Sequence, residues 1–311
     1  MTFDDLRVFL AVCQAGNLSA VARDLSCTQP AVSQHVKRLE QATGVRLLER
    51  RPDGVTPTPE GLLLYAAASD GIAGLDLALR RLGEFARGEA GSVRLHTGAT
   101  TIRHFMSEAI IEFRGRFPRA SLDFRTTVSS RQSFDAVLEG SVDLAWVTIN
   151  GTVPGVELRP VVELPWVLAV RDDDPIVRRA AIGPEDLTVI RHIRLPEHSA
   201  SRRHLDTALT RLGIHLTSET GVTDWNTAVL LAELGTGHAV VPALPYKSAA
   251  AGSRLRYLAL PFIPPLPVGW AVRRWDALTP LARAFADLVE RQCRTCLDEE
   301  PPLPSERPCG G

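Results

Sequence analysis

The sequence has few cysteines, no long apolar run and no basic N-terminal stretch, so it shows no pattern of disulfides, membrane-spanning helices or an export signal. Cysteine occurs five times in 311 residues, a low and odd number that is typical of reduced thiols in a cytosolic protein. No apolar run approaches the ~20 residues of a membrane-spanning helix. The N-terminus, MTFDDLRVFL, carries acids where a signal peptide has a basic stretch. We therefore predict a soluble, cytoplasmic protein with no membrane partner.

Groups that perform catalysis or hold metals are also missing. There is no nucleophile–base pair, no carboxylate pair at catalytic spacing and no metal cluster. Cys293 and Cys296 are spaced like a redox couple or half of a metal site, but they fall late in an expected helix and no second such pair exists. We predict a protein that is not an enzyme and needs no cofactor or metal. Redox sensing through these two thiols is a minor alternative.

Size and charge restrict how the chain would bind a nucleic acid. A length of 311 residues predicts two or three domains, and a net charge of −1 with 45% hydrophobic residues describes a globular protein. Residues 1–60 contain seven Lys/Arg and seven Asp/Glu. Any DNA binding by this segment must therefore use local positive charge, around Lys37-Arg38 and Arg46 to Arg51, and sequence-indifferent affinity should be modest.

Residues 18–47 have the pattern of two helices joined by a tight turn. The first helix carries apolar residues at the spacing i, i+3, i+4 and i+7, namely Leu18, Val21, Ala22 and Leu25. Ser26-Cys27-Thr28 interrupts this pattern. The hydroxyl of Thr28 is expected to cap the second helix, and Pro30 suits its first turn, where a missing N–H costs nothing.

The second helix is expected to expose a polar face. Val32, Val36 and Leu39 continue the apolar stripe. The residues turned outward are Gln29, Ser33, Gln34, Lys37 and Arg38. Glutamine and arginine can bond base edges, whereas serine and lysine reach phosphates. This face predicts a DNA-reading helix-turn-helix, and the alternative is a helical hairpin whose polar face meets water.

The flanking segments favour the DNA-binding interpretation. A helix is expected from about Phe3 to Ala15, ended by Gly16-Asn17, which completes a three-helix core. Further on, Asp53-Gly54 is a turn signal between two short extended pieces, the pattern of a two-stranded wing. Arg50 and Arg51 on its approach would lie near the DNA backbone, unless they are solvated surface charges.

A long helix should begin at Thr58-Pro59-Glu60, a cap followed by a proline, and run to about Arg87. Small and apolar residues recur in it at alternating spacings of four and three, a period of 3.5: Gly61, Tyr65, Ala68, Ile72, Leu75, Leu79, Leu82 and Ala86. Such a seam predicts a homodimer that places two recognition helices on neighbouring half-sites. The alternative is a helix lying on the core of its own domain.

Strands and helices alternate after a glycine-rich break at residues 87–91. Strands are expected at 92–98, 120–128, 142–148, 163–171, 188–194, 214–222, 238–242, 255–260 and 266–274, and helices at 100–117, 131–139, 201–212, 225–234 and 280–297. The alternation predicts parallel pairing in an α/β layer. Two lobes with chain crossings near residues 162 and 266 would resemble the periplasmic-binding-protein architecture (type 2), whose ligand site is the cleft between the lobes.

Polar residues where strands end and helices begin are the candidates for that site. Free N–H groups and the helix dipole favour anions there. The candidates are Thr100, Thr101, Ser129, Ser130 and Thr148 from one lobe, with Ser199, Ser201 and Asn226 from the other. Taken singly, each is better explained as a plain helix cap. An anionic ligand is favoured by the basic residues near the same loops, which are Arg103, His104, Arg131, Arg202 and Arg203.

The first 60 residues resemble the N-terminal signature of the LysR-type transcriptional regulators. The matching residues run in order and without gaps: Gly16 to Ala22 (GNLSAVA), Thr28 to Ser33 (TQPAVS), Leu39-Glu40, Gly44, Leu47-Leu48, Arg50 and Thr58 to Gly61 (TPEG). Departures are small. Leu48 stands where the family often has Phe, and Asn17-Leu18 where Ser-Phe is common.

The resemblance implies an α/β protein with a winged helix-turn-helix domain (residues 1–58), a linker and dimerisation helix (59–90) and a two-lobed effector-binding domain (91–297). Lobe I would comprise about 91–161 and 267–297, lobe II about 162–266. Residues 298–311, rich in proline and polar residues, are expected to be disordered. The resemblance implies DNA contacts by Gln29, Pro30, Ser33 and Gln34, and gives most support to Thr100, Thr101, Ser129 and Thr148 as effector contacts.

We therefore expect a sequence-specific transcriptional regulator controlled by a small, anionic effector bound between the lobes. Its expected partners are promoter DNA, the effector and further copies of itself, in a homodimer and, by resemblance, a homotetramer. RNA polymerase is a further partner to consider. The alternative function is a small-molecule-binding protein or enzyme that uses the two-lobed domain and needs the N-terminal helices only for dimerisation.

Overall fold

The computed structural model describes residues 1–52, 54–86, 91–127, 129–244 and 254–298. The expected disordered tail, apart from residue 298, and the turn residue Asp53 lie outside these ranges. The chain forms two compact units, one of them residues 1–87 with 138–140 and the other the rest of the chain. Each unit is described by itself.

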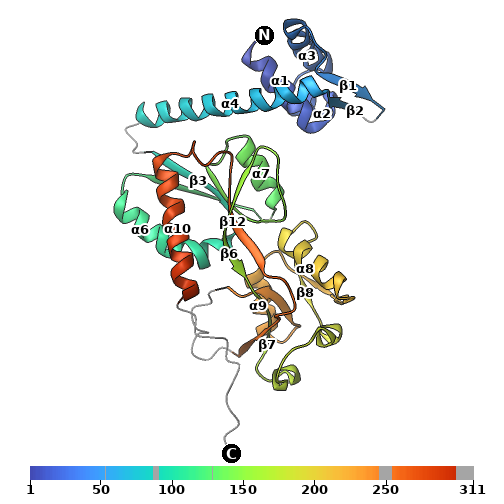
Figure 1. Ribbon diagram of the computed structural model, residues 1–311, viewed down its shortest axis with the longest axis vertical. Helices are drawn as coiled ribbons and strands as arrows, with labels where there is room; N and C mark the ends of the chain where they lie inside the picture. The colour runs from blue at the N-terminus through green and yellow to red at the C-terminus, as the bar shows by residue number, and fades with distance from the viewer. Residues whose placement is uncertain (53, 87–90, 128, 245–253, 299–311) are drawn as a thin grey trace, which may run out of the picture. The chain divides into compact units, whose positions relative to one another are not determined.

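The first unit is a winged helix-turn-helix followed by a long helix (Figure 1). Its elements are α1 (Phe3–Ala15), α2 (Leu18–Asp24), α3 (Gln29–Thr43), β1 (Leu48–Arg51), β2 (Gly54–Pro57) and α4 (Pro59–Ala86). The two strands pair antiparallel as the expected wing. One core cluster contains Val8, Val12, Val21, Ala22, Val32 and Val36 of the three helices, and a second contains Phe9, Leu39 and Leu47. The N-terminal fold predicted from the sequence is confirmed.

The helix boundaries follow from local caps, with two corrections. Gly16 takes a left-handed conformation (φ 62°) that ends α1, and the Asn17 side chain accepts from two backbone N–H groups at the start of α2. Thr28 does occupy the N-cap of α3, but its hydroxyl makes no capping bond. Leu25, expected on the buried face, is 49% exposed, because α2 ends at Asp24 and the next residue leaves the helical period.

The segment Thr58 to Gly61 joins the wing to α4. The Thr58 hydroxyl accepts a hydrogen bond from Gly61 N (2.9 Å) and donates to the carbonyl of Arg46 (2.8 Å). A Cβ added to Gly61 would overlap the carbonyl oxygen of Leu47, so only glycine permits this close approach. The start of α4 is thereby tied to the chain that enters the wing.

Much of the seam of α4 is exposed. Ala68 and Ile72 are buried, whereas Leu75, Leu79 and Leu82 are 38%, 56% and 64% exposed. By length and composition alone, Pro59–Leu79 would suffice to cross a membrane, at a mean hydropathy of 1.5 with 6% of the stretch buried. Glu60, Asp70 and Asp76 interrupt the segment, so it is not a continuous apolar run. Among the described residues of the unit, none covers these three leucines.

Lobe I of the second unit is a mixed five-stranded sheet with helices on both faces. The strand order is β4 (Ser121–Thr126), β3 (Ser92–Thr97), β5 (Leu144–Thr148), β12 (Leu266–Val272), β6 (Glu157–Leu164). β3 runs parallel to β4 and β5, as expected, while β12 is antiparallel to both neighbours. One face packs on α6 (Ser107–Arg116) and α10 (Pro280–Asp298), the other on α7 (Ser130–Leu138).

Lobe II departs from the expected parallel pairing. Its sheet has the order β10 (Ala239–Pro242), β7 (Trp166–Arg171), β11 (Leu255–Ala259) and is antiparallel throughout. Among the described residues, parallel pairing in this lobe is limited to the short β8 (Ile193–Arg194) with β9 (Thr220–Gly221) and an isolated bridge between His192 and His238. The strand expected over 188–194 is shorter because Pro184–Val189 forms a 3-10 helix. Helices α8 (Ala200–Arg211) and α9 (Trp225–Glu233) cover the two faces of the sheet.

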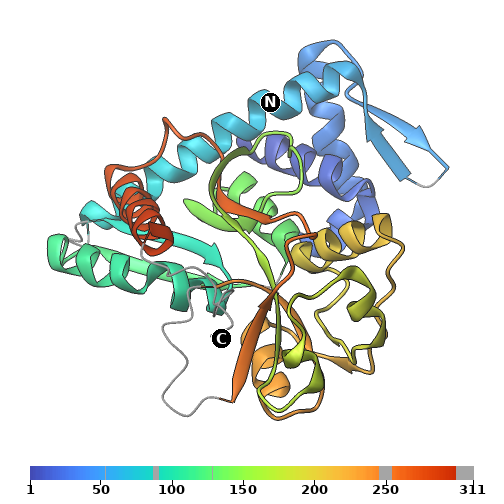
Figure 2. The same ribbon diagram turned by 60° about the horizontal axis from the view of Figure 1, so that its bottom comes forward.

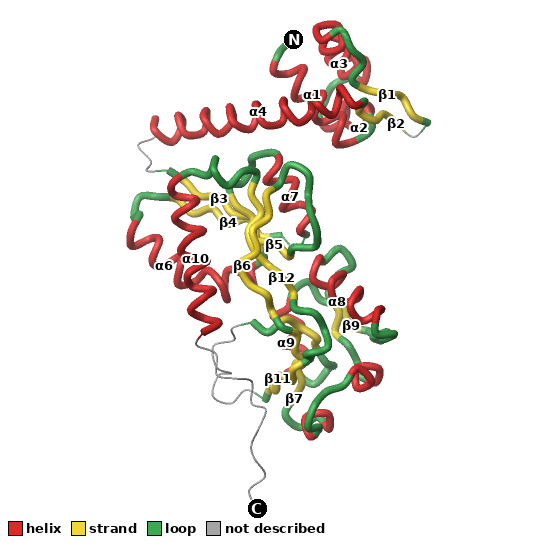
Figure 3. Tube along the Cα trace, viewed as in Figure 1, coloured by secondary structure: helices red, strands yellow, loops and turns green. Residues whose placement is uncertain are grey.

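Two adjacent strands carry the chain between the lobes (Figures 2 and 3). The strand expected over 163–171 is broken at Pro165, so that β6 ends in lobe I and β7 begins in lobe II. The return runs from β11 to β12 through residues 260–265. The indole N–H of Trp166 donates to the carbonyl of Pro264 (3.0 Å), which ties the two crossing segments together.

Candidate DNA-reading helix and effector pocket

Helix α3 presents the polar face that the sequence predicts. Pro30, Gln34 and Lys37 are exposed. The Gln29 amide donates to the Ser33 hydroxyl (2.9 Å), so these two side chains form one polar unit in the first turns of the helix. Amide, hydroxyl and ammonium groups on one helix face are suited to base edges and phosphates.

The arginines predicted to contact DNA have different surroundings. Arg50 and Arg51 are exposed on β1 of the wing, where Arg51 pairs with Glu49 at 3.2 Å. Arg38, expected to point outward, is only partly exposed, because Nε and Nη2 donate to the buried carboxylate of Asp5 on α1. Because its members are 33 residues apart, no local pattern in the sequence predicts this pair.

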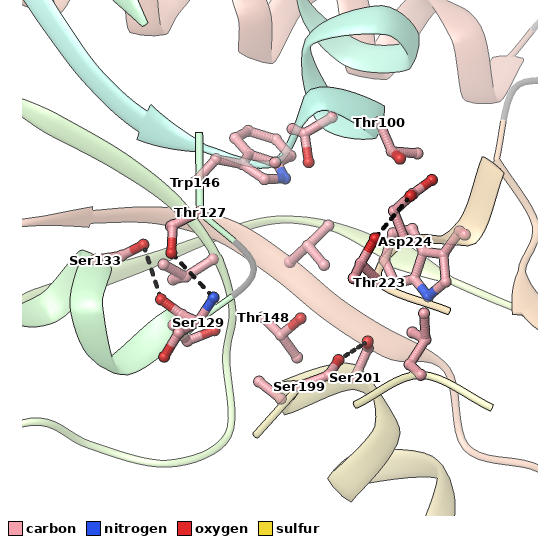
Figure 4. Close-up of a pocket in the computed structure, with 18 of the residues that line it drawn as sticks. Thr100, Thr127, Ser129, Ser133, Trp146, Thr148, Ser199, Ser201, Thr223 and Asp224 are labelled. Carbon is pink, nitrogen blue, oxygen red and sulfur yellow. Dashed lines mark hydrogen bonds between the residues drawn. The ribbon is translucent and has the colours of Figure 1, made fainter. Parts of the chain in front are cut away.

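A pocket of about 120 Å³ lies between the two lobes of the second unit (Figure 4). Seven of the eight predicted candidates line it: Thr100, Thr101, Ser129, Ser130, Thr148, Ser199 and Ser201. Asn226 does not, and its side-chain oxygen instead faces Nε2 of His104 at 3.5 Å. An apolar cavity of about 150 Å³ takes up benzene, so this pocket has the size for a single-ring molecule.

Hydroxyl groups dominate the polar part of the pocket wall. Thr100 is 6% exposed, and within the described part of the chain its hydroxyl has no hydrogen-bond partner. On the opposite lobe the hydroxyls of Ser199 and Ser201 bond to each other at 2.9 Å (Figure 4). Buried hydroxyls of this kind are usually paired, so Thr100 retains hydrogen-bonding capacity for a ligand.

The N-termini of three helices also border the pocket. Ser130 begins α7, Ala200 begins α8 and Trp225 begins α9, and all three residues line the cavity. Their first N–H groups and helix dipoles favour negative charge. Asp224 caps α9 by accepting from Thr227 N at 3.0 Å.

The basic residues behind the anionic prediction do not line the pocket. Among the described lining residues there is no Lys, Arg or His, and Asp224 is the only ionisable side chain. Arg202 instead donates to the carbonyl of Leu195 and pairs with Asp206 on its own helix, while Arg203 donates to the carbonyl of His198. These long side chains begin on α8 but turn back onto their own lobe. Any negative charge in the pocket would therefore be held by N–H and hydroxyl groups.

Aromatic and aliphatic residues that were not predicted from the sequence form much of the remaining wall. They are Phe105, Trp146, Leu164, Leu195, Trp225 and Val268. The rings of Phe105 and Trp146 stack with centroids 5.7 Å apart. Trp146 stands two residues before Thr148 on β5, so strand alternation already placed both on one face. That signal was present in the sequence. Trp225 begins the predicted helix 225–234 and adjoins the candidate Asn226, whereas Leu195 had no such signal.

A winged helix-turn-helix joined to a two-lobed unit with a ligand-sized pocket defines a DNA-binding protein that responds to a small molecule. Residues 3–62 match the family model "Bacterial regulatory helix-turn-helix protein, lysR family", and residues 86–294 match "LysR substrate binding domain". The chain belongs to the LysR family of transcriptional regulators. These proteins are regulators and not enzymes, so the alternative of an enzyme with merely structural N-terminal helices is wrong.

Individual relatives agree with this assignment. A probable RuBisCO transcriptional regulator of Cyanidium caldarium is 30% identical over 218 residues, which cover 68% of each chain. Full-length CbnR in complex with its target DNA shares the fold at 22% identity, with a TM-score of 0.53 over 94% of this chain and all of that one. The effector-binding domain of QuiR, solved with shikimate, has 18% identity and a TM-score of 0.57 over 66% of this chain and 98% of that one. In this family α4 is the linker helix.

Proposed function

We propose that the protein acts in the cytoplasm as a homodimer that reads a two-fold symmetric operator with its paired α3 helices. Gln29, Pro30, Ser33 and Gln34 would contact base edges, with Lys37 and Arg38 on the neighbouring phosphates. Arg50 and Arg51 of the wing would contact the flanking backbone. The exposed polar face of α3 carries this proposal.

The exposed leucines of α4 support dimerisation. Leu75, Leu79 and Leu82 continue the 3.5-residue seam beyond the buried Ala68 and Ile72. A second copy of the same helix would cover them. Association of dimers into a homotetramer and contact with RNA polymerase are further steps of the proposal that the family assignment suggests.

The effector we propose is a small anion of single-ring size. Its negative group would bind the Thr100 hydroxyl and the N–H groups at the starts of α7 and α8, since the Asp224 carboxylate already caps α9. Its body would pack on Trp146 and Phe105. Closure of the lobes around it would shift the paired DNA-binding domains and so change promoter contacts or bending.

A footprint on the DNA upstream of the protein's own gene tests DNA reading. At about 50 and about 200 mM salt with competitor DNA present, the wild type should protect paired half-sites on one face of the duplex. Ser33→Ala with Gln34→Ala should abolish that protection and leave the fold intact. Gln14→Ala, on α1, is the matched control and should footprint normally. Salt-labile protection without sequence preference, at this DNA and in a randomised pool, would contradict the proposal.

The same footprint tests the effector. Candidate carboxylates and their neutral amides are added in pairs, and the acids alone should change the protected pattern. Thr100→Val, which removes only a hydroxyl, should weaken the response about tenfold through loss of one hydrogen bond to a charged group. A response to the neutral members that Thr100→Val leaves unchanged would rule out an anionic effector at this position.

A further inference from the structure

One buried carboxylate joins the start of α1 to the outer face of α3. Asp5 is fully buried, with 0% of its side chain exposed. Oδ2 accepts from Thr2 N at 2.8 Å and so completes the N-terminal cap of α1. Oδ1 accepts from Nε and Nη2 of Arg38 at 2.9 and 2.6 Å.

These bonds fix the guanidinium of Arg38 along one edge. With Nε and Nη2 committed to Asp5, Nη1 makes no hydrogen bond to another described residue, and 40% of the side chain is exposed. Arg38 follows Gln34 by four residues, so the two share a face of α3. The exposed edge of a fixed guanidinium thus lies one turn beyond the residue that we expect to read a base.

The pair is also neutral as a whole. The Arg38 hydrogen bonds, together with those from Thr2 and His35, hold the pKa of Asp5 well below its usual range, so the carboxylate stays ionised and cancels the arginine charge. Nδ1 of His35 is 2.8 Å from Asp5 Oδ1 and 2.7 Å from Arg38 Nη2. Since a single nitrogen cannot both donate to one and accept from the other, His35 satisfies only one of these contacts in either tautomer.

We propose that Asp5 is a positioning residue for operator recognition. It holds Arg38 against α1 so that the remaining edge of the guanidinium meets a DNA phosphate in one orientation. The Asp5 carboxylate also cancels the positive charge of Arg38, which would otherwise strengthen binding to DNA of any sequence. The proposal rests on the proposed contact of Arg38 with DNA. It assigns a role in discriminating between DNA sequences to Asp5, which does not itself contact DNA.

The test compares binding to two duplexes of equal length. One carries the site that the wild-type protein selects from a randomised pool, and the other has mixed sequence. Asp5→Asn should weaken selected-site binding about tenfold, the loss of one charge-assisted interaction, while mixed-sequence binding is unchanged or tighter. Because a released Arg38 adds one net charge, the slope of log Kd against log salt on mixed DNA should steepen by about 0.9.

Two further variants separate positioning from general destabilisation. Thr2→Ala removes the other half of the α1 cap, since Asp5 N donates to the Thr2 hydroxyl at 3.2 Å, yet it leaves Asp5–Arg38 in place. It should lower thermal stability like Asp5→Asn without changing the ratio of the two affinities. In an Arg38→Gln background, Asp5→Asn should cause no additional loss at the selected site beyond about twofold.

Arg38→Lys keeps the test decisive even if Asp5→Asn does not fold. Lysine retains the charge but cannot form the two-nitrogen contact, so selected-site affinity should fall about tenfold as well. The proposal is overturned if Arg38→Lys binds the selected site like the wild type, or if Asp5→Asn weakens binding to both duplexes equally. It is also overturned if the fold-losses in selected-site affinity from Asp5→Asn and Arg38→Gln multiply in the double variant. If the wild type itself selects no site, the proposed function fails rather than the role of Asp5.

Discussion

His192 is a buried histidine in lobe II, 7% exposed, beside Trp225 and Arg202. Burial lowers its pKa from 6.5 to about 4, and electrostatic interactions with Arg202 and His238 act in the same direction. The folded protein therefore keeps the ring neutral in a pH range where the unfolded chain would protonate it. Since the unfolded state then binds more protons, this group makes the folded state less stable as the pH falls from 6.5 to 4.

We expect His192→Leu to remove that pH dependence. The difference between pKa values of 6.5 and about 4 corresponds to about 3 kcal/mol of unfolding free energy, lost by the wild type across this window and retained by the variant. Urea unfolding followed by tryptophan fluorescence at a series of pH values measures the loss. His215→Gln, at an exposed histidine, is the control. Parallel pH curves for wild type and His192→Leu would refute the assignment.

Among the elements, helices were predicted from the sequence more accurately than strands. A helix carries its own signals, such as Gly16 and Asn17 at the junction of α1 and α2, or Pro118 shortly after α6. A strand depends on partners that are remote along the chain. β7 pairs with β10 and β11, about seventy and ninety residues further on, and neither composition nor spacing indicates that direction of pairing.

The seam of α4 is the element whose role can be tested most directly. Leu79→Lys should raise the dissociation constant of the dimer about 100-fold, because each of two chains would lose about 1.5 kcal/mol of leucine burial. Sedimentation equilibrium measures this change. Leu63→Lys is the matched control, since Leu63 is 76% exposed and lies off the seam. A dimer that survives Leu79→Lys but not Leu63→Lys would place the interface on another face of the helix.

At the scale of the whole molecule, the two units should unfold separately. All five tryptophans fall after residue 140, in the second unit, so their fluorescence reports on that unit alone. Far-UV circular dichroism reports on the helices of both units. We expect the two signals to give non-coincident urea transitions, and operator DNA to shift only the transition that fluorescence does not see. Coincident curves that shift together would show that the units unfold as one.

The sequence by itself determined the features that depend on residues close to one another along the chain. The helix-turn-helix, the wing turn, the start of α4 at Thr58 and the hydroxyls at strand ends all follow from residues a few positions apart. Tertiary structure alone decided the long-range arrangements: the ion pair of Asp5 with Arg38, the meeting of Trp225 and Thr100 in the wall of one pocket, and the arginines of α8 turned away from that pocket. The reason is physical, because caps, turns and periodicity act within one or two helical turns. Which side chains meet across tens or hundreds of residues depends on how sheets and helices pack.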